Sequence, residues 1–301
     1  MKIAFVGAQD KPHELVCTHW TGIRAAAKRM PHEIRIFCCR SGEGFIQDII
    51  DWNPDVIIYN LIDMAKNQVW REALREHTNA KIVFWYTDCR TPKTGQISVN
   101  IKGTVDLFVT SSEDPHGFHE ASFGMNPEWV PQAAEPTEKP IFSENASVDF
   151  MFIGGKFNKE GFQERYDLID ELERYHGLQR INGEQDDVRA KIYKLMPLYY
   201  GSAKFSLDIS HFWDIPKYTS NRYWVIPAFW GFGVTKRFPD CELLVPETHH
   251  VYWDTIDELA DKMRYYRAHE SERQKMIQLG WQYAKDHHTY EHRINRILEL
   301  L

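Results

Sequence analysis

The stretch VDFMFIGG, residues 148–155, decides how the fold is interpreted. A short apolar run that stops at two glycines is typical of a buried parallel strand entering a turn. The segment EGFQERYDLIDELERYHG (160–177) then has the pattern of a helix closed by Gly177. A short strand at 178–183, a helix at 187–200 and a strand at 203–210 continue the alternation. Residues from 148 onward therefore predict an α/β unit.

The chain before this stretch shows the same alternation. Strand patterns occur at 2–6, 33–39, 55–61, 81–87 and 105–112, with helix patterns at 18–30, 44–52 and 64–77 between them. The order β-α-β-α-β favours an open parallel sheet with helices on both faces. The segment PQAAEPTEKPIFSENAS (131–147), with three prolines, is typical of a linker.

We therefore predict two Rossmann-like parallel-sheet domains facing a cleft. The first spans 1–135, the linker 136–147 and the second 148–285, followed by a C-terminal helix (286–301) that packs back on the first domain. Within the last part we expect a strand near CELLVP (241–246) and helices at about 254–268, 271–286 and 289–299.

Composition narrows the class of protein. The 301 residues are 43% hydrophobic and 26% charged, which is typical of globular chains. A net charge of −7 argues against a protein built around a nucleic-acid backbone. Five cysteines without a CxxC pair favour reduced thiols and a cytoplasmic location. No apolar run approaches the roughly 20 residues of a membrane-spanning helix, so no membrane span is predicted.

The ends of the predicted strands carry the candidate binding residues, because ligands of open α/β sheets bind there. Gly154, Gly155 and Lys156 follow a buried strand and precede a helix, where backbone amides favour an anion. A plain strand-to-helix turn would explain the same three residues. This is neither a G-x-G-x-x-G nor a P-loop pattern.

Two residues of the first half are candidates for acid–base chemistry. Asp88 ends a buried strand and is suited to take a proton from an acceptor hydroxyl, although an Asx turn or a helix cap is the alternative. His19, near the start of the first predicted helix, is a second candidate base or acceptor contact, with an ordinary satisfied or exposed histidine as the alternative.

The segment YTSNRYWVIPAFWGFGVTKRFPD (218–240) is apolar except at its beginning. Ser220 and Asn221 are candidate helix caps, and Arg222 offers a planar fork that matches phosphate. Pairing of Arg222 with a carboxylate at the edge of the core is the alternative. Two histidine pairs at helical spacing, His116 with His119 and His288 with His292, lack the further ligands of a metal site, so no metal is predicted.

The second half resembles the C-terminal domain of GT-B glycosyltransferases, in particular the CgeB-like group. The resemblance rests on the order VDFMFIGG, SLDIS, S-N-R-Y-W and the glycines that follow, and on the tail. In the tail it is carried by the acidic helix at 257–259, Glu272-Arg273, Gly280, and His288-Thr289-Tyr290 with Arg293. The first half is similar only as a generic acceptor domain.

This resemblance implies a metal-independent hexosyl- or pentosyltransferase whose nucleotide-sugar co-substrate, expected to be a UDP-sugar, binds in the second domain. Gly154 and Gly155 would lie near the diphosphate together with Lys156, and Arg222 would contact phosphate beside Ser220 and Asn221. The strand-end loop with Asp208, Ser210 and His211 would line the base and ribose pocket. No separate cofactor is expected, and Val225 stands where relatives usually carry a glutamate.

Other functions are compatible with the same frame. A non-catalytic nucleotide- or sugar-binding protein and a sugar-nucleotide epimerase would both use a cleft between two α/β domains. For a transferase, the acceptor stays open among a glycan, a protein and a modified DNA base, since relatives of this fold serve all of these. Retention or inversion stays open as well, although a base at Asp88 would favour inversion.

Overall fold

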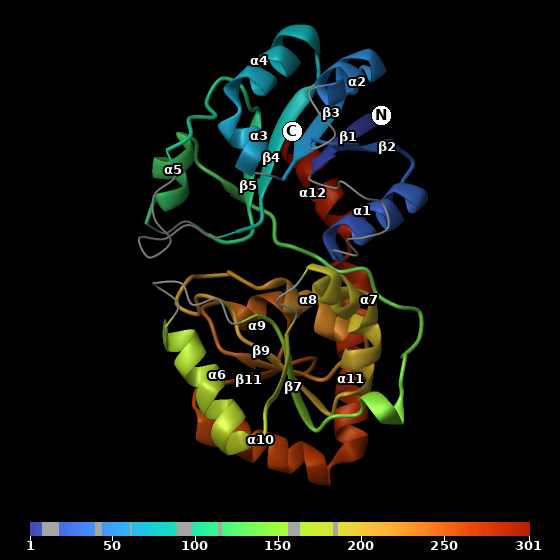
Figure 1. The fold of residues 1–301 in the computed structure, drawn as a ribbon, viewed down its shortest axis with the longest axis vertical. Coiled ribbons are helices and arrows are strands. Elements are labelled where there is room, and N and C mark those ends of the chain that lie inside the picture. The colour runs from blue at the N-terminus through green and yellow to red at the C-terminus, as the bar shows by residue number, and fades with distance from the viewer. Residues whose placement is uncertain are drawn as a thin grey trace. The chain divides into compact units, whose positions relative to one another are not determined.

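The computed structural model describes residues 1–7, 18–39, 44–60, 62–88, 98–113, 116–155, 163–182 and 186–301. Contacts within the chain define two compact units. Ile23–Pro131 and Glu291–Leu301, with the amino-terminal strand, form the first unit, and Gln132–Tyr290, with the first turn of the first helix, form the second. Each unit is built on its own sheet (Figure 1).

The first unit is a six-stranded sheet in the order β2-β1-β3-β4-β5-β6, with every described pair parallel. Its elements are β1 (Lys2–Gly7), α1 (Thr18–Arg29), β2 (Glu33–Cys38), α2 (Gly44–Trp52), β3 (Val56–Tyr59), α3 (Ile62–Lys66), α4 (Gln68–His77), β4 (Lys81–Tyr86), β5 (Leu107–Thr110), α5 (Phe118–Phe123) and β6 (Glu128–Trp129), joined at the end of the chain by α12 (Tyr290–Leu300).

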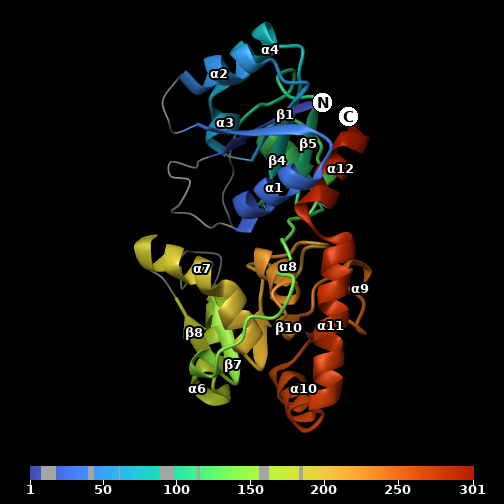
Figure 2. The same cartoon turned by 90° about the vertical axis from the view of Figure 1, so that its right-hand side faces the viewer.

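Alternation along the strands produces two apolar faces in this sheet. Ala4 and Val6 of β1 pack with side chains of α2, α3, α4 and α5 in one cluster. Ile3 and Phe5 are equally buried but do not belong to it. Figures 1 and 2 show α1 and α12 at the opposite face, which is where right-handed crossovers place α1.

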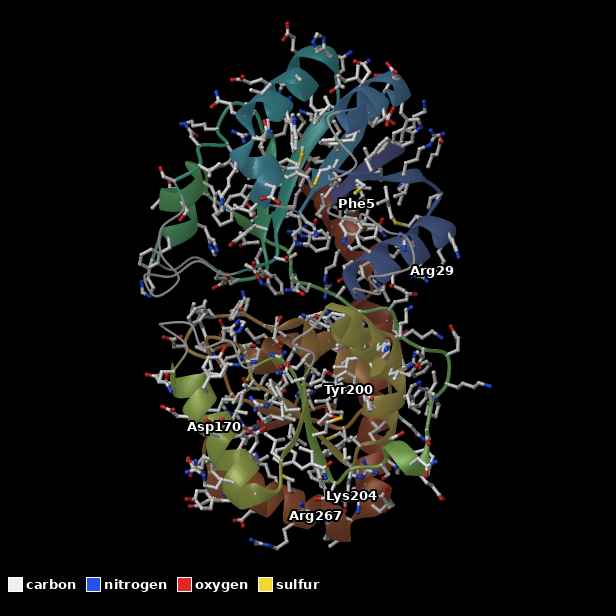
Figure 3. All side chains as sticks on the ribbon, in the orientation of Figure 1. Phe5, Arg29, Asp170, Tyr200, Lys204 and Arg267 are labelled. Carbon is white, nitrogen blue, oxygen red and sulfur yellow. The ribbon has the colours of Figure 1, made fainter. Side chains whose placement is uncertain are left out.

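The second unit is a five-stranded parallel sheet in the order β11-β10-β9-β7-β8. After a short 3-10 helix, Glu144–Ala146, its elements are β7 (Phe150–Ile153), α6 (Gln163–His176), β8 (Gln179–Ile181), α7 (Asp186–Ser202), β9 (Phe205–Asp208), α8 (Asn221–Ala228), β10 (Gly233–Lys236), α9 (Cys241–Leu244), β11 (Val251–Trp253), α10 (Ile256–Ala268) and α11 (Glu270–His287). Figure 3 labels Phe5 and Tyr200, which belong to the buried side chains of the first and second units respectively.

The prediction of two parallel α/β sheets is confirmed, and one local prediction is wrong. The CELLVP segment forms the helical turn α9, and the edge strand is β11. The hydroxyl of Tyr252 on β11 donates to the carbonyl oxygens of Cys241 (3.0 Å) and Val245 (2.7 Å), which a turn presents together at one point. A four-residue apolar run does not distinguish a strand from such a turn.

The helices of the tail are packed closely against the helix that carries Arg222. Figure 2 shows α11 beside α8, and the two helices are in contact. A Cβ atom on Gly280 of α11 would lie 2.9 Å from the carbonyl oxygen of His249 and 3.5 Å from Pro227 of α8. Glycine is therefore needed at this position for the close approach of the two helices. Among the described residues, no helix is both long and apolar enough to cross a membrane.

Candidate functional site

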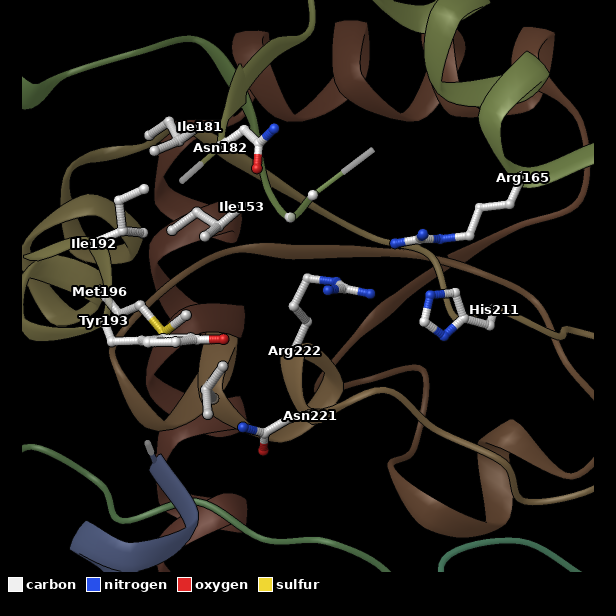
Figure 4. A pocket seen from close by; sticks show the side chains of 13 residues that line it. Ile153, Arg165, Ile181, Asn182, Ile192, Tyr193, Met196, His211, Asn221 and Arg222 are labelled. Atoms are coloured by element: carbon white, nitrogen blue, oxygen red, sulfur yellow. The ribbon is translucent and has the colours of Figure 1, made fainter. Parts of the chain in front are cut away.

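A pocket opens at the carboxyl ends of the strands of the second unit. It is lined where β7, β8 and β9 end and where α8 begins, together with α6 and α7 (Figure 4). This is the edge at which open parallel sheets bind ligands. Its lining residues are Ile153, Gly154, Gly155, Arg165, Ile181, Asn182, Ile192, Tyr193, Met196, His211, Asn221, Arg222 and Val225.

Arg222 lies in the first turn of α8 with 16% of its side chain exposed. Its Nη2 donates to the carbonyl oxygen of Ile209 at 2.9 Å, and its Nε lies 3.4 Å from Oδ1 of Asp208. The guanidinium also lies over the ring of Phe152, at 4.9 Å from the ring centroid. Arg222 thus both lines the pocket and pairs with a carboxylate, so the two alternative interpretations of this residue describe one arrangement.

Asp208 differs from the prediction that it would line the pocket, because its side chain is fully buried beneath Arg222. Oδ1 accepts a hydrogen bond from the Ser220 hydroxyl (2.7 Å), and Oδ2 accepts one from Thr235 (3.4 Å). Burial raises the pKa of Asp208, whereas Arg222 and these hydroxyl groups oppose that shift. The carboxylate therefore holds the start of α8 and its arginine in place.

Ser220 and Ser210 serve the same local structure. Ser220 occupies the N-cap position of α8, but its hydroxyl makes no capping hydrogen bond and donates to Asp208 instead. The backbone N–H of Ser220 donates to the hydroxyl of Ser210 at 2.8 Å, and Ser210 is buried. Of this predicted group, Asn221 and His211 do line the pocket.

Arg165 is a pocket residue that the sequence interpretation missed. It belongs to α6, is only 2% exposed, and its Nε donates to the same Ile209 carbonyl oxygen at 3.2 Å. Its buried Nη1 has no hydrogen-bond partner in the described part of the chain. Burial, followed by repulsion from Arg222, lowers the pKa of Arg165 to about 10. Two guanidinium groups thus meet at the carbonyl oxygen of Ile209, and that of Arg222 also pairs with the buried Asp208.

The glycine turn after β7 fits beside these arginines. A Cβ atom on Gly154 would meet the ring of Phe152 at 2.6 Å and lie 3.5 Å from Nη1 of Arg222. The absence of a side chain keeps the strand end open next to the cations, and Gly155 lines the same pocket. Lys156 lies outside the described residues.

The two acid–base candidates belong to other elements. Asp88 follows β4 and is exposed, and the carbonyl oxygen of neighbouring Thr87 accepts a hydrogen bond from the Ser111 hydroxyl at 2.8 Å. His19 lies in α1, but its side chain is outside the described part of the structure. Among the described residues, no group of three or more histidine, cysteine or acidic side chains is arranged to hold a metal ion.

Several solved structures of glycosyltransferases share this architecture. HepE of Anabaena, in complex with UDP and glucose, is 12% identical, with a TM-score of 0.61 over 100% of this chain and 99% of its own. An alpha-glucosyltransferase in complex with UDP and DNA containing an HMU base is 10% identical, with a TM-score of 0.66 over 99% and 98% of the chains. Sucrose-phosphate synthase from Thermosynechococcus elongatus is 10% identical, with a TM-score of 0.57 over 99% and 98%. The predicted GT-B fold is thereby confirmed.

The second half of the chain is similar to a known family. Residues 153–299 match the model of the glycosyl transferase-like family. The prediction of a glycosyltransferase is confirmed at this level. A search of curated proteins finds no match. The narrower resemblance to the CgeB-like group stays a prediction.

Proposed function

We propose that the protein transfers a hexose from a UDP-sugar to an acceptor hydroxyl, without a required metal ion. One observation carries the proposal: Arg165 and Arg222 both line the pocket and both donate to the carbonyl oxygen of Ile209, and Arg222 pairs with the buried Asp208. Arg165 keeps a buried Nη1 without a partner among the described residues. A diphosphate would supply the missing negative charge and the missing acceptor.

The nucleotide is proposed from the structural neighbours. HepE is recorded in complex with UDP-glucose, and the alpha-glucosyltransferase in complex with UDP. The pocket of this chain lies at the carboxyl edge of a parallel sheet and combines cations with a glycine turn. A UDP-hexose is accordingly the donor we propose, with its diphosphate against Arg165, Arg222 and the turn at Gly154.

The two arginines would act on the leaving group. The acceptor oxygen attacks the anomeric carbon, the bond from that carbon to the β-phosphate oxygen breaks, and its electron pair leaves with UDP. The charge that develops on the diphosphate is stabilised by guanidinium groups whose positions are fixed before the reaction. Losing one such donor costs about 3 kcal/mol of transition-state stabilisation in comparable sites.

The acceptor side is proposed to belong to the first domain, residues 1–135, and the donor side to residues 148–285. Asp88, exposed at the carboxyl end of β4, is the proposed base that takes the proton of the acceptor hydroxyl, and His19 is a proposed acceptor contact. The net charge of −7 favours a glycan or a protein over DNA as the acceptor. The proposed location of the protein is the cytoplasm.

A binding protein without catalysis is the second candidate, and Val225 favours it. Its side chain lines the pocket and is 1% exposed, at the position where the resembled family usually carries a glutamate. A valine cannot accept hydrogen bonds from ribose hydroxyl groups. Tight UDP binding with neither sugar transfer nor hydrolysis would support this candidate.

The test is incubation with UDP-, GDP-, dTDP- and CDP-hexoses and a panel of acceptors, with nucleotide release and product mass as readouts. We expect release of UDP with transfer of the sugar, and no loss of turnover in EDTA. C2 epimerisation, or binding to no nucleotide sugar, would contradict the proposal.

Asp88→Asn tests the proposed base separately. We expect turnover to fall by about 10²-fold or more, because general-base catalysis contributes roughly that much, while affinity for UDP stays unchanged. Asp63→Asn, a substitution of the same type on α3 of the same unit, is the control and should leave turnover unaltered. A fully active Asp88→Asn enzyme would remove Asp88 from the mechanism.

A further inference from the structure

The pocket of the second unit has two ends of different chemistry. In Figure 4, Arg165 and His211 lie on one side, Arg222 lies in the middle, and the other side carries aliphatic side chains together with Tyr193. These aliphatic residues come from β7, β8 and α7, and are Ile153, Ile181, Ile192 and Met196. The cationic end suits a diphosphate, whereas the aliphatic end suits the flat faces of a ring.

Asn182 brings a carboxamide to the aliphatic end. It directly follows Ile181, the last residue of β8, and Figure 4 shows its side chain beside Ile181 above Ile153. Its side chain is partly exposed and makes no hydrogen bond to the described residues. A carboxamide offers one acceptor and one donor side by side. Such a group pairs with a base edge that carries a donor next to an acceptor.

We infer that Asn182 recognises the edge of the nucleobase of the donor, with uracil as the base. This inference rests on the proposed function, because it assumes that the diphosphate occupies the arginine end. Uracil N3–H would donate to Oδ1 of Asn182, and uracil O4 would accept from Nδ2. The ring faces would contact Ile153, Ile192 and Met196. Asn182 is therefore a recognition residue for the base edge, distinct from the groups that hold the phosphates.

Two substitutions of Asn182 distinguish hydrogen bonding to the base from the effect of charge in the pocket. Asn182→Leu keeps a similar volume and removes both hydrogen-bonding groups, so the dissociation constant for UDP should rise roughly tenfold or more. Asn182→Asp keeps only acceptors and would place an anion against uracil O4. A carboxamide can turn over to pair with N3 and the amino group of cytosine, and a carboxylate loses one of the two hydrogen bonds to either base, so the affinities for UDP and CDP should both fall by about tenfold.

The experiment is calorimetric titration of the full chain with UDP, CDP and inorganic pyrophosphate, using wild type, both variants and Asn295→Asp. Asn295 is exposed on α12 and is not a lining residue of the pocket, so this control introduces the same charge at a different site. Pyrophosphate affinity should be the same in wild type and Asn182→Leu, and the control should match wild type for every ligand.

The possible outcomes distinguish a failure of the proposed function from a failure of the role of Asn182. Wild-type protein that fails to bind UDP would contradict the proposed function itself. Wild-type protein that binds UDP, together with Asn182→Leu and Asn182→Asp variants that retain its affinity, would overturn the role of Asn182 and leave the donor proposal standing.

Discussion

Two arginines of this protein are buried to the same degree but differ in how many of their guanidinium nitrogens make hydrogen bonds. Arg71 of the first unit and Arg165 of the second are each 2% exposed. Arg71 donates from Nη1 to the carbonyl oxygens of Ala65 and Met64, from Nη2 to that of Asn100 (2.9 Å) and from Nε to the Thr104 hydroxyl (2.9 Å). Within the described residues, Arg165 makes one hydrogen bond, from Nε, and its Nη1 has no partner.

This difference in hydrogen bonding distinguishes an arginine that stabilises the fold from one that is available to bind a ligand. Every nitrogen of the Arg71 guanidinium is used to join α3, α4 and the loop before β5, so the charge serves the fold. Arg165 is placed against a second cation, Arg222, which adds to the effect of burial in lowering its pKa. A buried cation that is incompletely paired costs stability unless a ligand completes it.

Loss of Arg71 should have the largest effect. Arg71→Leu would remove the donor to three carbonyl oxygens, two of them in buried hydrogen bonds, so we expect the free energy of unfolding to fall by about 3 kcal/mol or more. Chemical denaturation measures this change, and the remaining folded protein should bind UDP as wild type does. Arg264→Leu, at a largely exposed arginine, is the matched control and should change stability by less than about 1 kcal/mol.

Arg222→Ala should act mainly on the ligand. We expect the affinity for UDP to fall roughly 10- to 100-fold, because a charge-assisted hydrogen bond contributes about 1.5–3 kcal/mol. Titration well below the melting temperature measures it, since Asp208 also loses its partner in this variant. Arg222→Lys should recover part of the affinity through its charge but not the fork geometry. Unchanged UDP affinity in Arg222→Ala would disprove the assignment of the site.

Arg165→Met gives the sharpest contrast with Arg71. Methionine keeps an apolar stem and removes a buried, incompletely paired charge, so stability without ligand should be equal to or higher than that of wild type. Affinity for UDP should fall by about tenfold. Thermal denaturation with and without UDP measures both quantities in one series. A destabilised variant with unaltered UDP affinity would make Arg165 a structural residue like Arg71.

Glu270→Gln should have the smallest effect. Glu270 pairs with a third arginine, Arg273, whose Nε, Nη1 and Nη2 all donate hydrogen bonds. Hydrogen bonds from Arg273 lower the pKa of Glu270 to about 2, below its ordinary value of 4.5. The stabilisation is therefore present above pH 4.5 and is lost as the pH falls through 2.

Because the Glu270 side chain is about half exposed, we expect Glu270→Gln to cost less than about 1 kcal/mol at pH 7. The difference from wild type should vanish near pH 2, as measured by urea titration across pH. A difference that persists there would exclude the ion pair as its cause.

Local patterns were sufficient to predict most of the strands and both sheets, because apolar runs ending in glycine or polar residues recur at each one. The site was predicted less completely. Arg165 shares one face of α6 with buried Ile169 and Leu172, four and seven positions later, so a charge on the apolar stripe was the available signal. The other charged residues of α6 made this signal hard to recognise.

Asp208 shows why the remaining features of the site could not be predicted from the sequence. Its place at the end of a strand indicates the right edge of the sheet, but the sequence does not reveal whether a strand-end side chain faces the ligand or lies beneath its neighbours. The hydroxyl groups of Ser220 and Thr235 decide this, and they come from 12 and 27 positions further along the chain. The roles of Asp88 and His19 stay predictions for the same reason.

The last helix has a consequence for the order of folding. Ile294 and Ile297 of α12 are fully buried in the first unit, and Glu291 pairs with Arg29 at 3.1 Å across 262 positions of sequence. A ribosome must therefore complete the entire second unit before the first can bury its remaining apolar surface. Contacts this distant in sequence are slow to form, so the nascent first unit is the part most exposed to chaperones and to aggregation.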